Sequence, residues 1–172
     1  MAKQKTLILV RHAKSSWSDA TLNDIQRPLN KRGNKDAPKM GDHMAKQKIL
    51  PEVIYSSSGL RALTTARLIS VKIGIKPSEI IAEDDIYTFS SEELLNVIKS
   101  IRDSYNKVMI VGHNPAITDL TNFLSGSNID NIPTCGVAVL EFSIDSWKKV
   151  GGNSARLVSF GYPKKLWKKK SK

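Results

Sequence analysis

Short apolar runs alternate with helical patterns over the first two thirds of the chain. Residues 7–10, 53–55 and 108–111 form three such runs, each rich in β-branched side chains. Runs of this length and composition are typical of fully buried strands. Because each run is followed by apolar residues at helical spacing, the pattern predicts a mostly parallel sheet with helices on both faces.

Four helical segments accompany these strands. They are expected at residues 35–48, 59–73, 91–101 and 115–124. Ser90 or Ser91 followed by Glu93 resembles a helix-start signal for the third helix. Asn114 is the expected N-cap of the fourth helix, with Pro115 at its first position.

The pattern changes from Cys135 onward. Residues 137–144 and 155–160 are expected to form two strands around the turn residues 151–153, as an antiparallel hairpin at the sheet edge. We therefore expect a three-layer α/β/α fold, whose mostly parallel sheet ends in this C-terminal hairpin. A single domain over residues 1–162 would be followed by a basic tail at 163–172.

Composition narrows the class of protein. A chain of 172 residues with 40% hydrophobic content can bury one sizeable core, and a single cysteine excludes an internal disulfide. The first apolar run is too short for a signal peptide or a membrane span. We therefore expect a soluble, cytoplasmic protein with no membrane partner.

The chain is strongly basic, with 27 Lys and Arg against 16 Asp and Glu and a formal net charge of +11. Part of the excess lies in residues 163–172, which contain no acidic residue. We interpret this segment as a solvated tail, and an acidic partner for it is the alternative. No recognition motif accompanies it, so nucleic acid is not expected as a partner. The remaining excess suits a small anionic substrate group.

Candidate chemistry follows the predicted strands. Arg11 and His12 follow the first strand, Arg61 lies shortly after the second, and His113 and Asn114 follow the third. Ligands of open parallel sheets bind in the crevice outside the carboxyl ends of the strands. Two histidines and two arginines are therefore expected to converge on one crevice.

The segments around these residues resemble the histidine phosphatase superfamily, the group that includes the cofactor-dependent phosphoglycerate mutases. Residues 9–18 are similar to its Arg-His-Gly signature, Ser56 with 61–66 to its Ser-x-x-x-x-Arg-Ala-x-x-Thr-Ala block, 111–114 to its third block and 27–33 to its Arg-Pro-Leu-Thr-x-x-Gly element. The blocks stand in the family's order. In its short length and its sequence Arg-His-Ala-Lys-Ser-Ser-Trp, the chain resembles the small phosphohistidine phosphatase branch of this superfamily, the SixA-like proteins.

The resemblance implies that His12 is the nucleophile and that His113 donates a hydrogen bond to the transferring phosphate. Side-chain chemistry supports these roles, because Arg11 and Arg61 can give bidentate, permanently charged contacts to a phosphoryl group. Neutral imidazole attacks phosphorus and leaves it again readily. Flanking arginines disfavour the imidazolium form, so we expect His12 to stay neutral.

Other residues are weaker candidates. Ser18, Arg27 and Asn114 are expected to contact the phosphate, whereas Lys14, where the mutases have Glu, is interpreted as solvated. His43 lies in a polar helix and receives no function. With three histidines and one cysteine the chain offers no metal-ligand cluster. We expect neither a metal nor another cofactor.

A general acid is not securely placed. Family members that cleave sugar or glycerate esters use a Glu after the third strand, commonly with a Gly a few residues on, and residues 80–87 lack that Gly. Glu83 is the nominal acid, followed by Asp84 and Asp85; an acidic loop or helix start is the alternative interpretation. A phosphohistidine substrate has a better leaving group and depends less on an acid.

These observations predict a metal-independent phosphatase that forms a covalent phosphohistidine on His12 and acts on phosphohistidine in proteins. One alternative is a phosphatase or mutase of small phosphate esters, although the family's mutases are longer and carry extra segments. Another is a non-catalytic phosphate-binding module. His12 argues against that module, because binding needs only the arginines.

Overall fold

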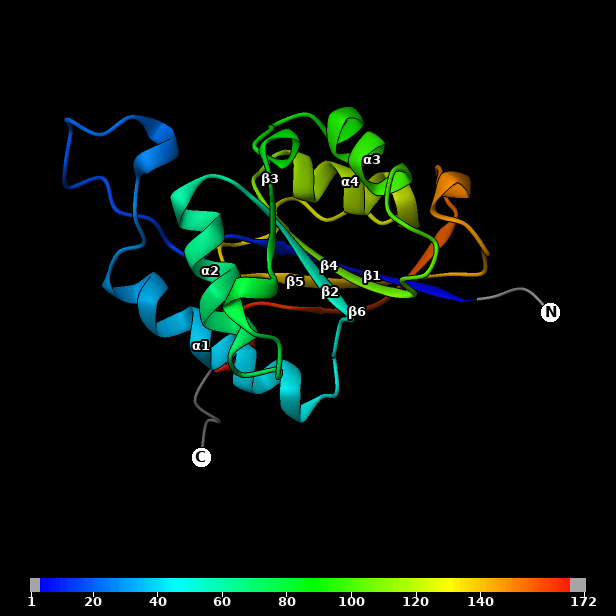
Figure 1. Ribbon diagram of the computed structural model, residues 1–172, viewed down its shortest axis with the longest axis horizontal. Helices are drawn as coiled ribbons and strands as arrows, with labels where there is room; N and C mark the ends of the chain where they lie inside the picture. The colour runs from blue at the N-terminus through cyan, green and yellow to red at the C-terminus, as the bar shows by residue number, and fades with distance from the viewer. Residues whose placement is uncertain (1–3, 168–172) are drawn as a thin grey trace.

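A single six-stranded sheet lies between two layers of helices in the computed structural model, which describes residues 4–167 (Figure 1). The strands are β1 (Lys5–Arg11), β2 (Val53–Ser57), β3 (Ile81–Glu83), β4 (Lys107–Gly112), β5 (Val137–Phe142) and β6 (Ala155–Gly161). Their order is β3-β2-β4-β1-β5-β6. The first four strands are parallel, and β5 and β6 are antiparallel to their neighbours. The expected fold class is confirmed.

The helices cover both faces of this sheet. They are α1 (Lys31–Lys46), α2 (Leu60–Ser70), α3 (Ser91–Lys99), α4 (Ala116–Ser125) and α5 (Pro163–Leu166), with 3-10 turns at η1 (Asp24–Gln26), η2 (Pro77–Glu79), η3 (Asp84–Ile86) and η4 (Trp147–Lys149). Figure 1 shows α1 and α2 on one face and α3 and α4 on the other. None of the helices between residues 4 and 167 has both the length and the apolar character needed to cross a membrane.

Strand β1 contributes apolar side chains to two hydrophobic cores, one on each face of the sheet. Leu7 and Leu9 pack with α3 and α4, whereas Ile8 and Val10 pack with α1 and α2. All four side chains are at most 1% exposed. Burial on both faces is why this strand has a continuous apolar run instead of an alternating one.

Helix α1 begins four residues earlier than the apolar pattern predicts. The side chain of Asn30 accepts a hydrogen bond from the backbone N–H of Gly33 at 2.9 Å, which caps the helix before its first apolar residue. A Cβ atom on Gly33 would lie 2.1 Å from the carbonyl oxygen of Lys14. The glycine of the Arg-Pro-Leu element therefore lets α1 start directly against the segment that follows β1.

The last two strands form the expected antiparallel pair at the sheet edge, but no tight turn joins them. Their connection, residues 143–154, contains η4, and Trp147 within it is fully buried against Phe142. The apolar burial of Trp147 explains why the connection is long, since a two-residue turn could not carry this side chain into the core. The glycines 151 and 152 lie only at its end.

The segment expected to be a basic tail begins with the helical turn α5. Leu166 and Trp167 pack against the core on the α1 side, and the ammonium group of Lys39 lies 4.4 Å from the Trp167 ring centre. These apolar side chains explain the ordered turn. The rest of the expected tail, 168–172, lies outside the described residues.

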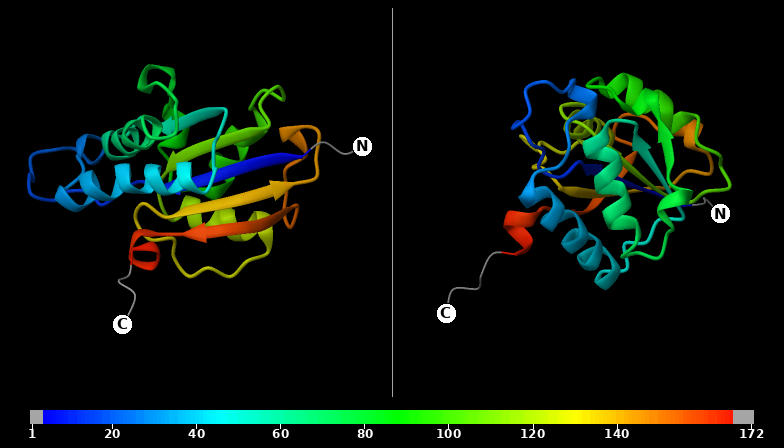
Figure 2. Two further views of the ribbon diagram at one scale, coloured as in Figure 1. Left: turned by 90° about the horizontal axis from the view of Figure 1, so that it is seen from below. Right: turned by 60° about the vertical axis from the view of Figure 1, so that its left-hand side comes forward.

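The carboxyl ends of β1, β2 and β4 lie at one end of the sheet. From there the segment between β1 and α1 extends away from the body of the molecule, as the blue loop at the left of Figure 1 and of the left-hand view in Figure 2. This segment contains residues 12–30, including η1. The three strand ends and this loop together surround the candidate site.

Candidate active site

His12 lies directly after β1, and the surroundings of its ring identify its tautomer. Its Nδ1 is 2.7 Å from the backbone carbonyl oxygen of Ala13, which can only accept, so Nδ1 carries the proton. The Nε2 atom then carries an unprotonated lone pair, which accepts a long hydrogen bond from the Nε–H of Arg61 at 3.4 Å.

The electrostatic setting of His12 keeps this ring neutral. Burial lowers the pKa of His12 to about 3; the bond to Ala13 opposes this effect, and the charges of His113, Arg61 and Arg11 add to it. At neutral pH, His12 is thus a buried imidazole whose Nε2 is an available nucleophile.

Arg61 lies in the first turn of α2, as expected. Its two terminal nitrogens donate to the backbone oxygen and to Oδ2 of Asp24, at 2.7 and 2.9 Å. Arg11 donates one hydrogen bond, to the carbonyl oxygen of Ile132 at 3.0 Å. Burial, and then the charge of Arg61, lower the pKa of Arg11. Two guanidinium groups that repel each other in this way favour an anion between them.

The tautomer of His113 follows from Ser57, a residue that the motif analysis missed. Ser57 Oγ lies 2.8 Å from Nε2 of His113 and accepts the N–H of Gly59 at 3.0 Å. Among the contacts of the described residues, Nε2 is the acceptor available to the Ser57 hydroxyl hydrogen. We assign the proton of His113 to Nδ1, with Ser57 as the donor, which leaves the N–H of Nδ1 for a bound oxyanion; the reverse arrangement would leave the Ser57 hydroxyl hydrogen without a partner instead.

His113 is also held neutral. Burial, followed by the charge of Arg61, lowers its pKa to about 4, while Asp24 opposes the shift and Arg11 contributes to it. The rings of His12 and His113 lie with their centres 5.2 Å apart. The site thus holds one imidazole with an unprotonated Nε2 and, in the tautomer assigned to His113, a second that offers an N–H.

These groups line a cavity of about 290 Å³. The residues around it are Arg11, His12, Lys14, Ser15, Trp17, Asp24, Arg27, Arg61, Phe89, His113, Asn114 and Thr134. Two buried atoms of this lining, Nε of Arg11 and Nδ1 of His113, have no hydrogen-bond partner. Orphaned buried polar atoms are rare in native proteins, and both of these belong to residues that line this cavity.

Asp24 is a site residue that sequence reasoning missed. Its carboxylate accepts from Arg61 and from Arg27 at 3.1 Å, and also from the Tyr87 hydroxyl. Burial acts to raise the pKa of Asp24, but hydrogen bonds from Tyr87, Arg61 and Arg27 lower it to about 2. Its one signal in the sequence is an acidic residue three positions before Arg27.

The weaker candidates separate into two groups. Arg27 and Asn114 line the cavity, as does Lys14, whose side chain is exposed. The Asn114 side chain is engaged within the protein, because it donates to Ile132 and accepts from Thr118. Ser18 is not part of the lining: it is exposed, and its hydroxyl contacts Ser16 at 2.8 Å.

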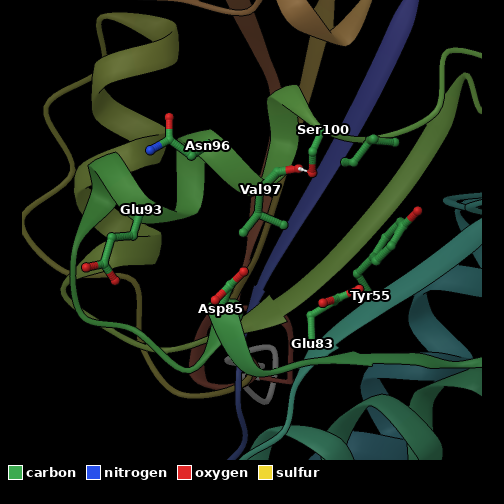
Figure 3. Close-up of a pocket in the computed structure, with 8 residues that line it drawn as sticks. Tyr55, Glu83, Asp85, Glu93, Asn96, Val97 and Ser100 are labelled. Atoms are coloured by element: carbon green, nitrogen blue, oxygen red, sulfur yellow. Dashed lines mark hydrogen bonds between the residues drawn. The ribbon is translucent and has the colours of Figure 1, made fainter.

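Glu83 does not line the His12 cavity, although its register partner in β2 is Ser57, and its nomination as the general acid stays a prediction. It ends β3 at the sheet edge and lines a separate cavity of about 550 Å³, together with Tyr55, Asp85 and residues of α3 (Figure 3). Asp84 is likewise absent from the lining of the His12 cavity. Strand β3 ends at Glu83 and η3 follows directly, so Tyr87 and Phe89, which come after η3, are the residues of this segment that reach His113.

Thr65 is the threonine of the Ser-x-x-x-x-Arg-Ala-x-x-Thr-Ala block, and its hydrogen bonds give it a structural role. Its hydroxyl donates to the carbonyl oxygen of Arg61 at 2.7 Å and accepts the N–H of Ala13 at 2.9 Å. Thr65 therefore ties the residue after His12 to the helix that carries Arg61. Of the described residues, no three or more His, Cys, Asp or Glu side chains gather in a way that could hold a metal ion.

Comparison with known proteins defines the class. The family described as "Histidine phosphatase superfamily (branch 1)" matches residues 7–86. A chloroplastic protein of Arabidopsis thaliana is 31% identical over 153 residues, which cover 84% of this chain and 70% of that protein. The chain belongs to the histidine phosphatase superfamily.

Within the superfamily, the chain belongs with the SixA-like proteins. The crystal structure of SixA from Agrobacterium tumefaciens, a provisionally assigned phosphohistidine phosphatase, superposes with a TM-score of 0.79 at 28% identity, covering 92% of this chain and 98% of that one. By contrast, a 2,3-bisphosphoglycerate-dependent phosphoglycerate mutase of Mycobacterium leprae is 38% identical over only 65 residues, 37% of this chain and 26% of the mutase.

Proposed function

We propose that this chain is a phosphatase that removes the phosphoryl group from phosphohistidine in proteins, through a covalent intermediate on His12. The observation that carries the proposal is the state of the His12 ring. Its Nδ1 proton is held by Ala13 at 2.7 Å, and burial lowers its pKa to about 3, so the Nε2 electron pair is unprotonated at neutral pH and is contacted by the Nε–H of Arg61 through a long hydrogen bond. A site that only binds phosphate has no need of such an atom.

The first step transfers the phosphoryl group to the enzyme. The Nε2 electron pair of His12 forms a bond to phosphorus while the bond between phosphorus and the substrate imidazole breaks. The electron pair of the broken bond stays on the leaving imidazole nitrogen, which takes a proton from solvent. Arg11 and Arg61 stabilise the charge that spreads over the three equatorial oxygens, and Nδ1–H of His113 donates to one of them.

The second step releases phosphate. Water attacks the phosphorus of phosphorylated His12, and the bond between phosphorus and Nε2 breaks, which returns the electron pair to Nε2. The attacking water loses one proton to solvent, and inorganic phosphate leaves. The enzyme returns to its starting tautomer because Ala13 retains the Nδ1 proton throughout.

The lining of the cavity supports a substrate with a good leaving group. Asp24 is the one carboxylic residue among the described residues that line it. Since its hydrogen bonds hold its pKa at about 2, Asp24 is ionised at neutral pH and has no proton to give to a basic alkoxide. Imidazole needs little such help.

Trapping the intermediate tests the proposal. The protein is mixed with N-phosphorylimidazole, quenched in alkaline detergent to preserve phosphohistidine, and digested for mass spectrometry. We expect the phosphoryl group on His12 in the wild-type protein and in His43→Ala, which removes a histidine outside the cavity, and none in His12→Ala. Full turnover by His12→Ala, or a phosphoryl group on another residue, would contradict the mechanism.

We further propose that the reaction needs no metal ion. Turnover of N-phosphorylimidazole should be unchanged after dialysis against a chelator. Loss of activity that magnesium or zinc restores would exclude this part of the proposal.

A further inference from the structure

Two exposed aromatic side chains line the His12 cavity. Trp17 is 76% exposed and Phe89 is 52% exposed, and they come from separate segments, the loop after β1 and the chain after η3. Large aromatic surfaces carry much of the binding energy at recognition sites when they are buried by a partner. Their position beside a phosphate-sized cavity indicates a ligand with more than a phosphoryl group.

Trp17 is held in place from one side. The guanidinium carbon of Arg27 lies 3.2 Å from the centre of the Trp17 ring. Arg27 is itself 7% exposed and is fixed by hydrogen bonds to Ser15, Ser16 and Asp24. Although most of its surface is accessible, the indole is therefore anchored on a buried cation.

Phe89 is held in place by the rings of His113 and Tyr87. Its ring packs edge-on against His113, with centres 6.0 Å apart, and lies at the same distance from the ring of Tyr87. Tyr87 also packs against His113, at 5.2 Å. Half of the Phe89 surface remains open to a ligand.

Space for such a ligand continues beyond the phosphate cavity. A second hollow of about 300 Å³ is lined by Trp17, Asp24 and Arg27, which also line the first, and by Asp19, Ala20 and Leu22. Trp17 is therefore bordered by two adjoining cavities. A substrate whose phosphoryl group lies at His12 has room to extend along this indole.

We propose that Trp17 and Phe89 form a binding site for the planar ring that carries the phosphoryl group, which is the imidazole of phosphohistidine. This inference rests on the proposed function and names how that substrate is selected. Flat rings stack on aromatic faces with little dependence on hydrogen bonding, whereas an alkyl chain gains no comparable contact. The arginines bind the phosphoryl group, and the two aromatic residues bind the imidazole ring that carries it.

The test compares two substrates that share a phosphorus–nitrogen bond. N-phosphorylimidazole has the ring and phosphoramidate lacks it. Each variant is compared with the wild-type protein on the same substrate, so that the different leaving groups cancel. We expect Trp17→Ala and Phe89→Ala each to raise KM for N-phosphorylimidazole by about threefold to tenfold, the size of one aromatic contact, and to leave phosphoramidate unchanged.

Two further variants separate stacking from other effects. Trp17→Phe keeps an aromatic face and should retain most of the ring preference. Phe123→Ala removes an aromatic side chain of α4 that is 50% exposed but does not line the cavity, and should change neither substrate.

The remaining outcomes distinguish this inference from the proposed function. Equal losses for both substrates, or no loss for either, would overturn the ring site. If the wild-type protein cleaves neither phosphorus–nitrogen substrate, the phosphohistidine proposal fails. The same variants are then measured with phenyl and methyl phosphate, where a loss confined to phenyl phosphate would still support the ring site and equal effects would exclude it.

Discussion

The hydroxyl oxygen of Ser57 lies 2.8 Å from Nε2 of His113, and the direction of this hydrogen bond decides which nitrogen of His113 carries the proton. The hydroxyl is oriented because its oxygen already accepts the N–H of Gly59. Ser57 ends β2 and His113 follows β4, two strands that are paired in the sheet. Two neighbouring strand ends thus cooperate to present one N–H.

Removing this hydroxyl should slow the chemical step. In Ser57→Ala, His113 can place its proton on either nitrogen, so we expect kcat to fall by about tenfold, the value of one buried hydrogen bond. Ser57→Thr keeps a hydroxyl and should recover much of the activity. Nitrogen NMR of His113 reports the tautomer directly, and an unchanged Nδ1–H form in Ser57→Ala would refute the role of Ser57.

Asp24 competes with the substrate for Arg61. Its carboxylate holds Arg61 at 2.9 Å and Arg27 at 3.1 Å, so it occupies donors that a phosphate would use. We expect Asp24→Asn, which removes the negative charge and keeps the shape, to tighten the competitive inhibition by phosphate by about fivefold to tenfold. Asp19→Asn is the matched control, because Asp19 lies on the same loop and its carboxylate accepts from the backbone and hydroxyl of Thr21. Weaker phosphate inhibition in Asp24→Asn would show that the carboxylate mainly orders the arginines.

The two site histidines should make folding sensitive to mild acid. Burial lowers the pKa of His12 to about 3 and that of His113 to about 4, whereas both take up protons near pH 6.5 in the unfolded chain. The unfolded state therefore binds more protons between pH 6.5 and about 4, and the free energy of unfolding should fall as the pH falls through this range.

Urea unfolding at several pH values measures this effect, which is limited to about 1.4 kcal/mol per pH unit for each histidine. His12→Asn should reduce the slope. Asp24 acts in a lower window, because its stabilising contribution is lost only as the pH falls from 3.8 toward its pKa of about 2. The same slope in the wild-type protein and in His12→Asn would contradict the assignment of a neutral His12.

Leaving-group basicity should control turnover. Because the one carboxylate in the cavity lining is ionised, rates are expected to fall steeply from phosphohistidine and aryl phosphates to sugar phosphates. Glu83→Gln should change none of these rates, since Glu83 lines a different cavity. If sugar phosphates prove the best substrates and Glu83→Gln destroys that activity, the protein is an ester phosphatase with Glu83 as its general acid.

The sequence was most informative where burial imposes a strong pattern. The apolar run that forms β1 predicts the strand, and the strand end predicts where Arg11 and His12 lie. Asp24 and Ser57 could not be found in this way, because their roles come from contacts across long sequence separations. Asp24 meets a helix 37 residues further along the chain, and Ser57 meets a histidine 56 residues away. Local spacing contains no signal for such pairs, and it cannot show that Glu83, the last residue of β3, is absent from the lining of the His12 cavity.

The placement of β1 divides the site into a part that is fixed and a part that is free to vary. Since β1 lies between β4 and β5 and is buried on both faces, amide exchange in it should require unfolding of the whole domain. Residues 17–21, by contrast, are exposed and contribute to no core. We therefore expect the position of His12 to be lost only when the whole fold unfolds. Substitutions in the loop beside it can change the range of substrates at little cost in stability.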